Sequence, residues 1–141
     1  MPLIAVDVIR GHDETHLTTL LDGIHAAVVE ALGVPTTDLY QILTQHEPFE
    51  LRALDTSLGY TRTRDLTIVR IVSKARPERA KQRLYELIAH NLHERFGLDG
   101  DDLVVSVVEN GAADWSFGRG RAEFLTGDLP DAPPTTVERA P

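Results

Sequence analysis

Apolar residues recur along the chain with two different spacings. Helical spacing in the first quarter predicts a helix that Asp13 caps and Gly33 ends. The apolar positions that carry this spacing are Leu17, Leu20, Leu21, Ile24, Val28 and Leu32. A second helix is predicted from about Pro77 to Phe96, just before Gly97. Alternating apolar runs predict strands on either side of each helix, at about 3–9, 39–46, 66–73 and 103–109.

These elements form two copies of one unit, displaced by 64 residues. The matched pairs are Gly33/Gly97, Asp38/Asp102, Ile4/Ile68, Leu20/Leu84, Ile24/Ile88 and Leu39/Leu103. A strand, a helix and a strand in succession form a βαβ unit, whose two strands are parallel with a right-handed crossover. Units at about 2–46 and 66–109 therefore predict an α+β fold, with a four-stranded mixed sheet and both helices on one face.

The remaining segments are a connection at about 47–65, a glycine-rich stretch and a proline-rich end. Trp115, Phe117 and Phe124 flank a glycine-spaced turn, which predicts a short C-terminal hairpin. Its aromatic side chains either wall a pocket or pack between subunits. With 141 residues we expect one domain, 1–129, followed by a disordered tail at 130–141.

Composition excludes several classes of function. The chain has no cysteine, which rules out disulfides, thiolate metal sites and a cysteine nucleophile. A net charge of −8 argues against nucleic acid, whose phosphates need a basic face, but not against a small anion held by local cations. Without a long apolar stretch or a signal peptide pattern, we expect a cytoplasmic protein with no membrane partner.

The most informative single residue is Pro2, which leads directly into the first strand. An internal proline nitrogen is an amide and has no proton to give. If Met1 is trimmed, the Pro2 nitrogen becomes a secondary amine that can act as acid, base or Schiff-base nucleophile. The alternative is that Pro2 only directs the removal of Met1.

Topology places other chemical groups near Pro2. Parallel pairing puts Asp38 level with Pro2, and antiparallel pairing of the two units would bring Lys74 and Arg76 to the same edge. Two cations before a helix N-terminus suit a carboxylate, which Arg76 can grip bidentately. The alternatives are a solvated basic turn for the cations and, for Asp38, a turn carboxylate that caps its own backbone.

A metal site is not expected. His12 and His16 flank Asp13, whereas the zincin pattern requires a glutamate directly after the first histidine, and no third ligand follows in motif spacing. His90 and His93, near the end of the second helix, complement its dipole or face solvent.

The terminal proline, the two βαβ repeats and the basic pair resemble the tautomerase superfamily. Within it the chain is similar to the malonate semialdehyde decarboxylase family up to Leu129. The resemblance rests on Asp38-Leu-Tyr-Gln, Gln45-His46-x-Pro48, Asp55-Thr56-x-Leu58-Gly59-Tyr60-x-Arg62 and the stretch from Asp114 to Leu129.

The resemblance implies a cofactor-free homotrimer that converts 3-oxopropanoate, a small anionic oxo acid, into acetaldehyde and CO₂. Pro2 would be the catalytic amine, Asp38 its partner, and Arg76 with Lys74 the carboxylate-binding pair. Trp115, Phe117, Phe124 and Leu129 would line an apolar wall. The family usually has arginine where this chain has Lys74. Two alternatives remain: a tautomerase or hydratase of the same superfamily acting on 2-oxo, acetylenic or haloacrylic acids, and a βαβ module that only binds small anions.

Overall fold

A computed structural model describes residues 2–130 of the chain. The first unit contains β1 (Leu3–Ile9), α1 (Glu14–Leu32) and β2 (Gln41–His46). The second contains β3 (Thr67–Lys74), α2 (Glu78–Phe96) and β4 (Leu103–Asn110). Short 3-10 helices at Pro48–Glu50, Gly100–Asp102 and Ala112–Asp114, and the one-turn α3 (Glu123–Thr126), complete the fold. The bounds of α1 and α2 differ by the same 64 residues at both ends, which confirms the predicted repeat.

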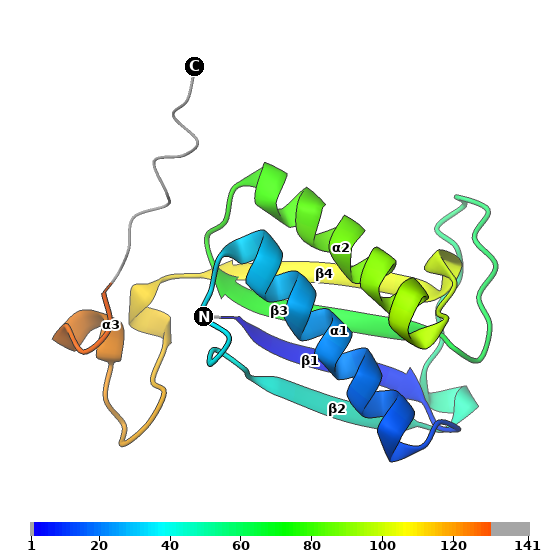
Figure 1. Ribbon diagram of the computed structural model, residues 1–141, viewed down its shortest axis with the longest axis horizontal. Coiled ribbons are helices and arrows are strands. Elements are labelled where there is room, and N and C mark those ends of the chain that lie inside the picture. Colours follow the sequence, from blue (N-terminus) through cyan, green and yellow to red (C-terminus); the bar gives the residue numbers. More distant parts are fainter. Residues whose placement is uncertain (1, 131–141) are drawn as a thin grey trace.

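The four strands form one sheet in the order β2-β1-β3-β4, as predicted. The pairs β1/β2 and β3/β4 are parallel, and β1/β3 is antiparallel. Both long helices cover one face of the sheet (Figure 1). The core lies between these layers and includes Ile4, Val6, Leu20, Ile24, Val69, Ile71, Leu84, Ile88 and Leu92.

The predicted helix ends are confirmed. The side chain of Asp13 accepts the His16 N–H at the start of α1. Gly33 and Gly97 end the two helices in the left-handed region, at φ 66° and 79°, where glycine carries no Cβ penalty. Strand β2 begins two residues later than predicted. Tyr40 nevertheless accepts the Ile4 N–H through its carbonyl at 2.9 Å, so the chain runs beside β1 from that point.

The predicted C-terminal hairpin is wrong. After β4 the chain forms a 3-10 turn, an irregular link and α3 instead of two strands. Arg119 and Gly120 both have positive φ, which turns the chain tightly. Across that turn, the Glu123 carboxylate accepts the Phe117 N–H at 2.9 Å, so a side chain joins the two limbs in place of a strand ladder.

Neither long helix within residues 2–130 has the apolar length required to span a bilayer. Residues 131–141, most of the predicted tail, lie outside the described part of the chain.

The repeat partners Asp38 and Asp102 have diverged in environment. Asp102 is 1% exposed, and its carboxylate accepts both the backbone N–H and the hydroxyl of Thr63. We expect Asp102→Ala to lower the free energy of unfolding by roughly 1–3 kcal/mol, because the backbone N–H and the hydroxyl of Thr63 both lose their acceptor. Urea denaturation measures this, with Asp22→Ala on the exposed side of α1 as the neutral control. Equal stability of the two variants would contradict the assignment.

Candidate active site

One edge of the sheet collects the predicted site residues. Strands β1 and β2 begin there, β3 and β4 end there, and the segment from Asn110 to Pro130 extends from the same edge (Figure 1). Pro2 is buried at the start of β1. Since Leu3 pairs with Val72, Lys74 also lies at this edge. The structure therefore confirms the convergence that the topology predicted.

Arg76 lies in the short link between β3 and α2. Its Nε donates to the hydroxyl of Ser73 and its Nη1 to the carbonyl of Leu32, both at 3.3 Å. Ser73 is fully buried, and Leu32 is the last residue of α1, where helix carbonyls attract a cation. These contacts hold the guanidinium beside the buried Ser73 and the end of α1.

The charges at this edge influence one another. Burial lowers the pKa of Arg76 from its usual value, and the nearby Asp38 carboxylate opposes that shift. Burial also lowers the pKa of Lys74, and the charge of Arg76 lowers it further. Asp38 is therefore within electrostatic reach of Arg76, and the two cations are close enough to repel each other. Two adjacent cations therefore lie at this edge of a chain whose net charge is −8.

The aromatic residues form a continuous wall beside these charges. Trp115 stacks on Phe117 with ring centroids 5.3 Å apart, and Phe124 meets Phe117 edge to face at 5.7 Å. The ammonium of Lys74 lies 4.3 Å from the centroid of Phe124, a cation–π contact. Leu129 is partly buried just beyond α3, and its N–H donates to the carbonyl of Glu123, the first residue of that helix.

Sequence reasoning missed two contributors to this wall. The ring of Tyr40 lies 5.6 Å from that of Phe117 and extends the wall to the first repeat. The side chain of Asn110 accepts the indole N–H of Trp115 at 2.8 Å and so fixes the plane of the indole ring. Asn110 is the register partner of Lys74, so strand pairing offered a signal for it. Tyr40 precedes β2, and its place in the motif Asp38-Leu-Tyr-Gln was the signal that could have marked it.

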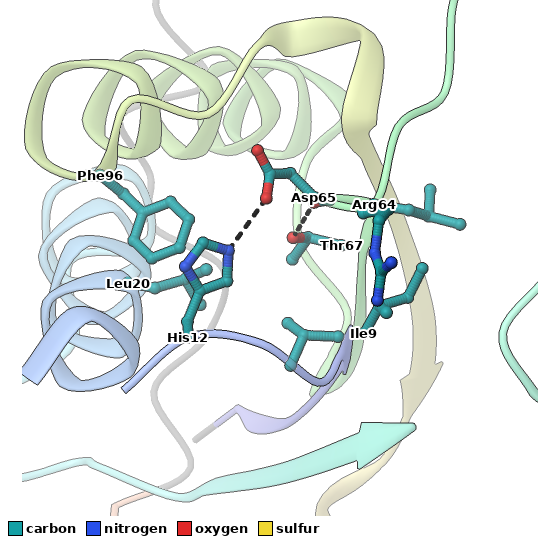
Figure 2. Close-up of a pocket in the computed structure, with 9 residues that line it drawn as sticks. Ile9, His12, Leu20, Arg64, Asp65, Thr67 and Phe96 are labelled. Atoms are coloured by element: carbon teal, nitrogen blue, oxygen red, sulfur yellow. Dashed lines mark hydrogen bonds and ion pairs between the residues drawn. The ribbon is translucent and has the colours of Figure 1, made fainter. Parts of the chain in front are cut away.

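The His12–His16 stretch lies at the opposite end of the sheet. Figure 2 shows His12 beside Phe96 and Leu20, with its Nε2 2.9 Å from an oxygen of Asp65. The rings of His12 and Phe96 are 4.9 Å apart. Within residues 2–130, no three histidine, aspartate or glutamate side chains gather in a way that could hold a metal ion. This end of the molecule contains none of the predicted site residues.

Family models and relatives agree on one superfamily. A model of tautomerase enzymes matches residues 38–118, and a second tautomerase enzyme model matches residues 2–59. The chain is 48% identical over 129 residues to the probable tautomerase YrdN of Bacillus subtilis (strain 168), covering 92% of this chain and all of that protein.

Solved structures of a decarboxylase are also similar to this chain. Crystal structures of malonate semialdehyde decarboxylase in wild-type, mutant and inactivated forms match with a TM-score of 0.88 at 45% identity, over 90% of this chain and 98% of that one. The FG41 malonate semialdehyde decarboxylase inhibited by 3-bromopropiolate matches with the same TM-score at 34% identity, over 92% and 99%. By these matches and by its two βαβ repeats, the chain belongs to the tautomerase superfamily of enzymes.

Proposed function

We propose that this protein decarboxylates 3-oxopropanoate to acetaldehyde and CO₂, with the nitrogen of Pro2 as the catalytic group once Met1 is removed. The observation that carries the proposal is the meeting of Pro2, Asp38 and the cations Lys74 and Arg76 at one sheet edge. A likeness in structure to malonate semialdehyde decarboxylase supports the same reaction.

The cationic pair would hold the carboxylate that leaves. Arg76 is fixed by its contacts to Ser73 and Leu32, so it can orient the carboxylate as well as attract it. Lys74 adds a point charge in front of the ring of Phe124. The aromatic wall excludes water from the carboxylate as its charge moves into the breaking C–C bond.

Pro2 would turn the aldehyde into an electron sink. Loss of CO₂ from 3-oxopropanoate leaves an electron pair on C2, which must be delocalised into the carbonyl. A protonated Pro2 does this by hydrogen bonding to the carbonyl oxygen. A neutral Pro2 does it by condensing with the carbonyl to an iminium, which is hydrolysed after C2 takes up a proton. In the first route a carboxylate at the same edge, that of Asp38, would favour the protonated amine.

A parallel assay separates this proposal from its rivals. Trimmed protein is incubated with 3-oxopropanoate while acetaldehyde is followed, and with phenylpyruvate while enol–keto conversion is followed. We expect acetaldehyde to form from 3-oxopropanoate faster than phenylpyruvate converts between its enol and keto forms. Faster enol–keto conversion would favour the tautomerase that the name of the 48% identical relative suggests. Catalysis of neither reaction would favour a module that only binds small anions.

We also propose a homotrimer with the uncovered sheet faces turned inward. Leu3, Ile42 and Val108 lie on the face opposite the helices and are 36%, 55% and 62% exposed. Exposed apolar groups spread over such a face are typical of an interface. Sedimentation at micromolar concentration should give about three times the 15.6 kDa of one chain. The mass of a single chain would refute this assembly.

Substrate binding should weaken at alkaline pH earlier than an ordinary lysine would allow. The pKa of Lys74 lies below the usual 10.5, so its charge is lost as pH rises through that lower value. KM for 3-oxopropanoate should then increase. Lys74→Arg keeps its charge over this range and should show a flatter KM profile. Identical profiles for the wild type and Lys74→Arg would show that Lys74 does not bind the substrate.

A further inference from the structure

Glu109, at the end of β4, reaches the turn that carries Arg76. In the parallel pair β3/β4, Glu109 is the register partner of Ser73. Its Oε2 accepts the backbone N–H of Arg76 at 2.6 Å and lies 3.4 Å from the ammonium of Lys81 in the first turn of α2. Both contacts, the N–H of Arg76 foremost, lower the pKa of Glu109. One carboxylate thus joins β4, the link and α2.

The link between β3 and α2 relies on Glu109 for a backbone hydrogen bond. Only two residues, Ala75 and Arg76, separate the end of β3 from Pro77, the N-cap of α2. Pro77 has no side-chain capping bond and, as a proline, no N–H of its own. The N–H of Arg76 lies outside the strand and helix ladders, and the Glu109 carboxylate supplies its acceptor.

The guanidinium itself is held less tightly than its backbone. Its two bonds, to Ser73 and to Leu32, are each 3.3 Å long, whereas the backbone contact to Glu109 measures 2.6 Å. Glu109 therefore holds the backbone from which the Arg76 side chain reaches the edge, and Ser73 and Leu32 hold the guanidinium. We infer that Glu109 is a positioning residue for Arg76, a role that rests on the proposed function of Arg76 in holding the carboxylate.

Two substitutions of Glu109 separate the effect of side-chain length from the effect of charge. Glu109→Asp keeps the charge but shortens the side chain, so it should lose the contact and lower kcat/KM roughly 10- to 100-fold, through a lower kcat and a higher KM together. Glu109→Gln keeps the length and an acceptor oxygen and should retain most of the activity. Lys81→Ala is the matched control, because it removes the other partner of the carboxylate and leaves the Arg76 N–H contact intact. Circular dichroism verifies the fold of each variant.

A double-mutant cycle tests whether Glu109 acts through Arg76. In an Arg76→Ala background, Glu109→Asp should cause no further loss, because there is no guanidinium left to position. Equal losses in both backgrounds would overturn the inference. So would a loss in Glu109→Gln or Lys81→Ala as large as in Glu109→Asp, since the charge or the helix start would then be what matters.

Binding keeps this test separate from the proposed function. Trp115 is the only tryptophan of the chain and lies in the wall of the site, so its fluorescence can report malonate as a non-reacting carboxylate probe. If the wild type does not decarboxylate 3-oxopropanoate, the proposed reaction fails. The role of Glu109 still stands if the wild type and Glu109→Gln bind malonate more tightly than Glu109→Asp. Equal binding by all three, or no binding by the wild type, would overturn it.

Discussion

A chain that keeps an extension in front of Pro2 is expected to lose at least about 100-fold in turnover while keeping its fold. The extension makes the Pro2 nitrogen an amide, which can neither donate a proton nor form an iminium. A large residue inserted between Met1 and Pro2 prevents trimming, and the initial rate of acetaldehyde release measures the effect.

The control is the same extended chain after a protease has removed the extension and exposed Pro2. Its activity should return to that of the trimmed wild type. Mass spectrometry reports which first residue each preparation carries. Full activity in a preparation that uniformly retains Met1 would show that the nitrogen of Pro2 is not the catalyst.

Arg76→Ala is expected to lower kcat and raise KM together, with kcat/KM falling about 10- to 100-fold. Charge-assisted hydrogen bonds of this kind contribute roughly 1.5–3 kcal/mol each. A contact used equally in the ground and transition states would change KM only, whereas one that orients the leaving carboxylate also changes kcat. Steady-state kinetics on 3-oxopropanoate measures both constants.

Substitutions of Lys74 provide the comparison. Lys74→Ala should mainly raise KM, because a flexible ammonium fixes orientation poorly, and Lys74→Arg should preserve or improve turnover by supplying a planar fork. An Arg76→Ala enzyme with wild-type kcat and KM would place the carboxylate elsewhere and remove Arg76 from the site.

The fold was predictable because local and global patterns agree. Helical spacing, a capping Asp13 and the end glycines Gly33 and Gly97 define the two long helices, and the repeat defines which strands are parallel. The antiparallel pairing of β1 with β3 was the one assumption about topology, and the register confirms it. The meeting of Pro2, Lys74 and Arg76 at one edge of the sheet was predictable from that topology.

The segment after β4 was less predictable because side chains, not a strand ladder, determine its shape. Alternating aromatics around Phe117 suggested strands, yet Glu123 satisfies the N–H of Phe117 and Arg119 turns the chain at positive φ. Similarly, the repeat paired Asp38 with Asp102 without showing which one faces the site. Burial and the bonds to Thr63 make Asp102 the structural member.

The products formed from 3-oxopropanoate by chains that begin at Pro2 test the central claim most directly. Proton NMR can follow loss of the substrate and formation of acetaldehyde in one sample, with CO₂ release measured alongside. The account predicts one acetaldehyde and one CO₂ for each 3-oxopropanoate consumed, at a rate proportional to protein concentration. Unchanged 3-oxopropanoate, or its consumption without acetaldehyde, would contradict decarboxylation by this protein.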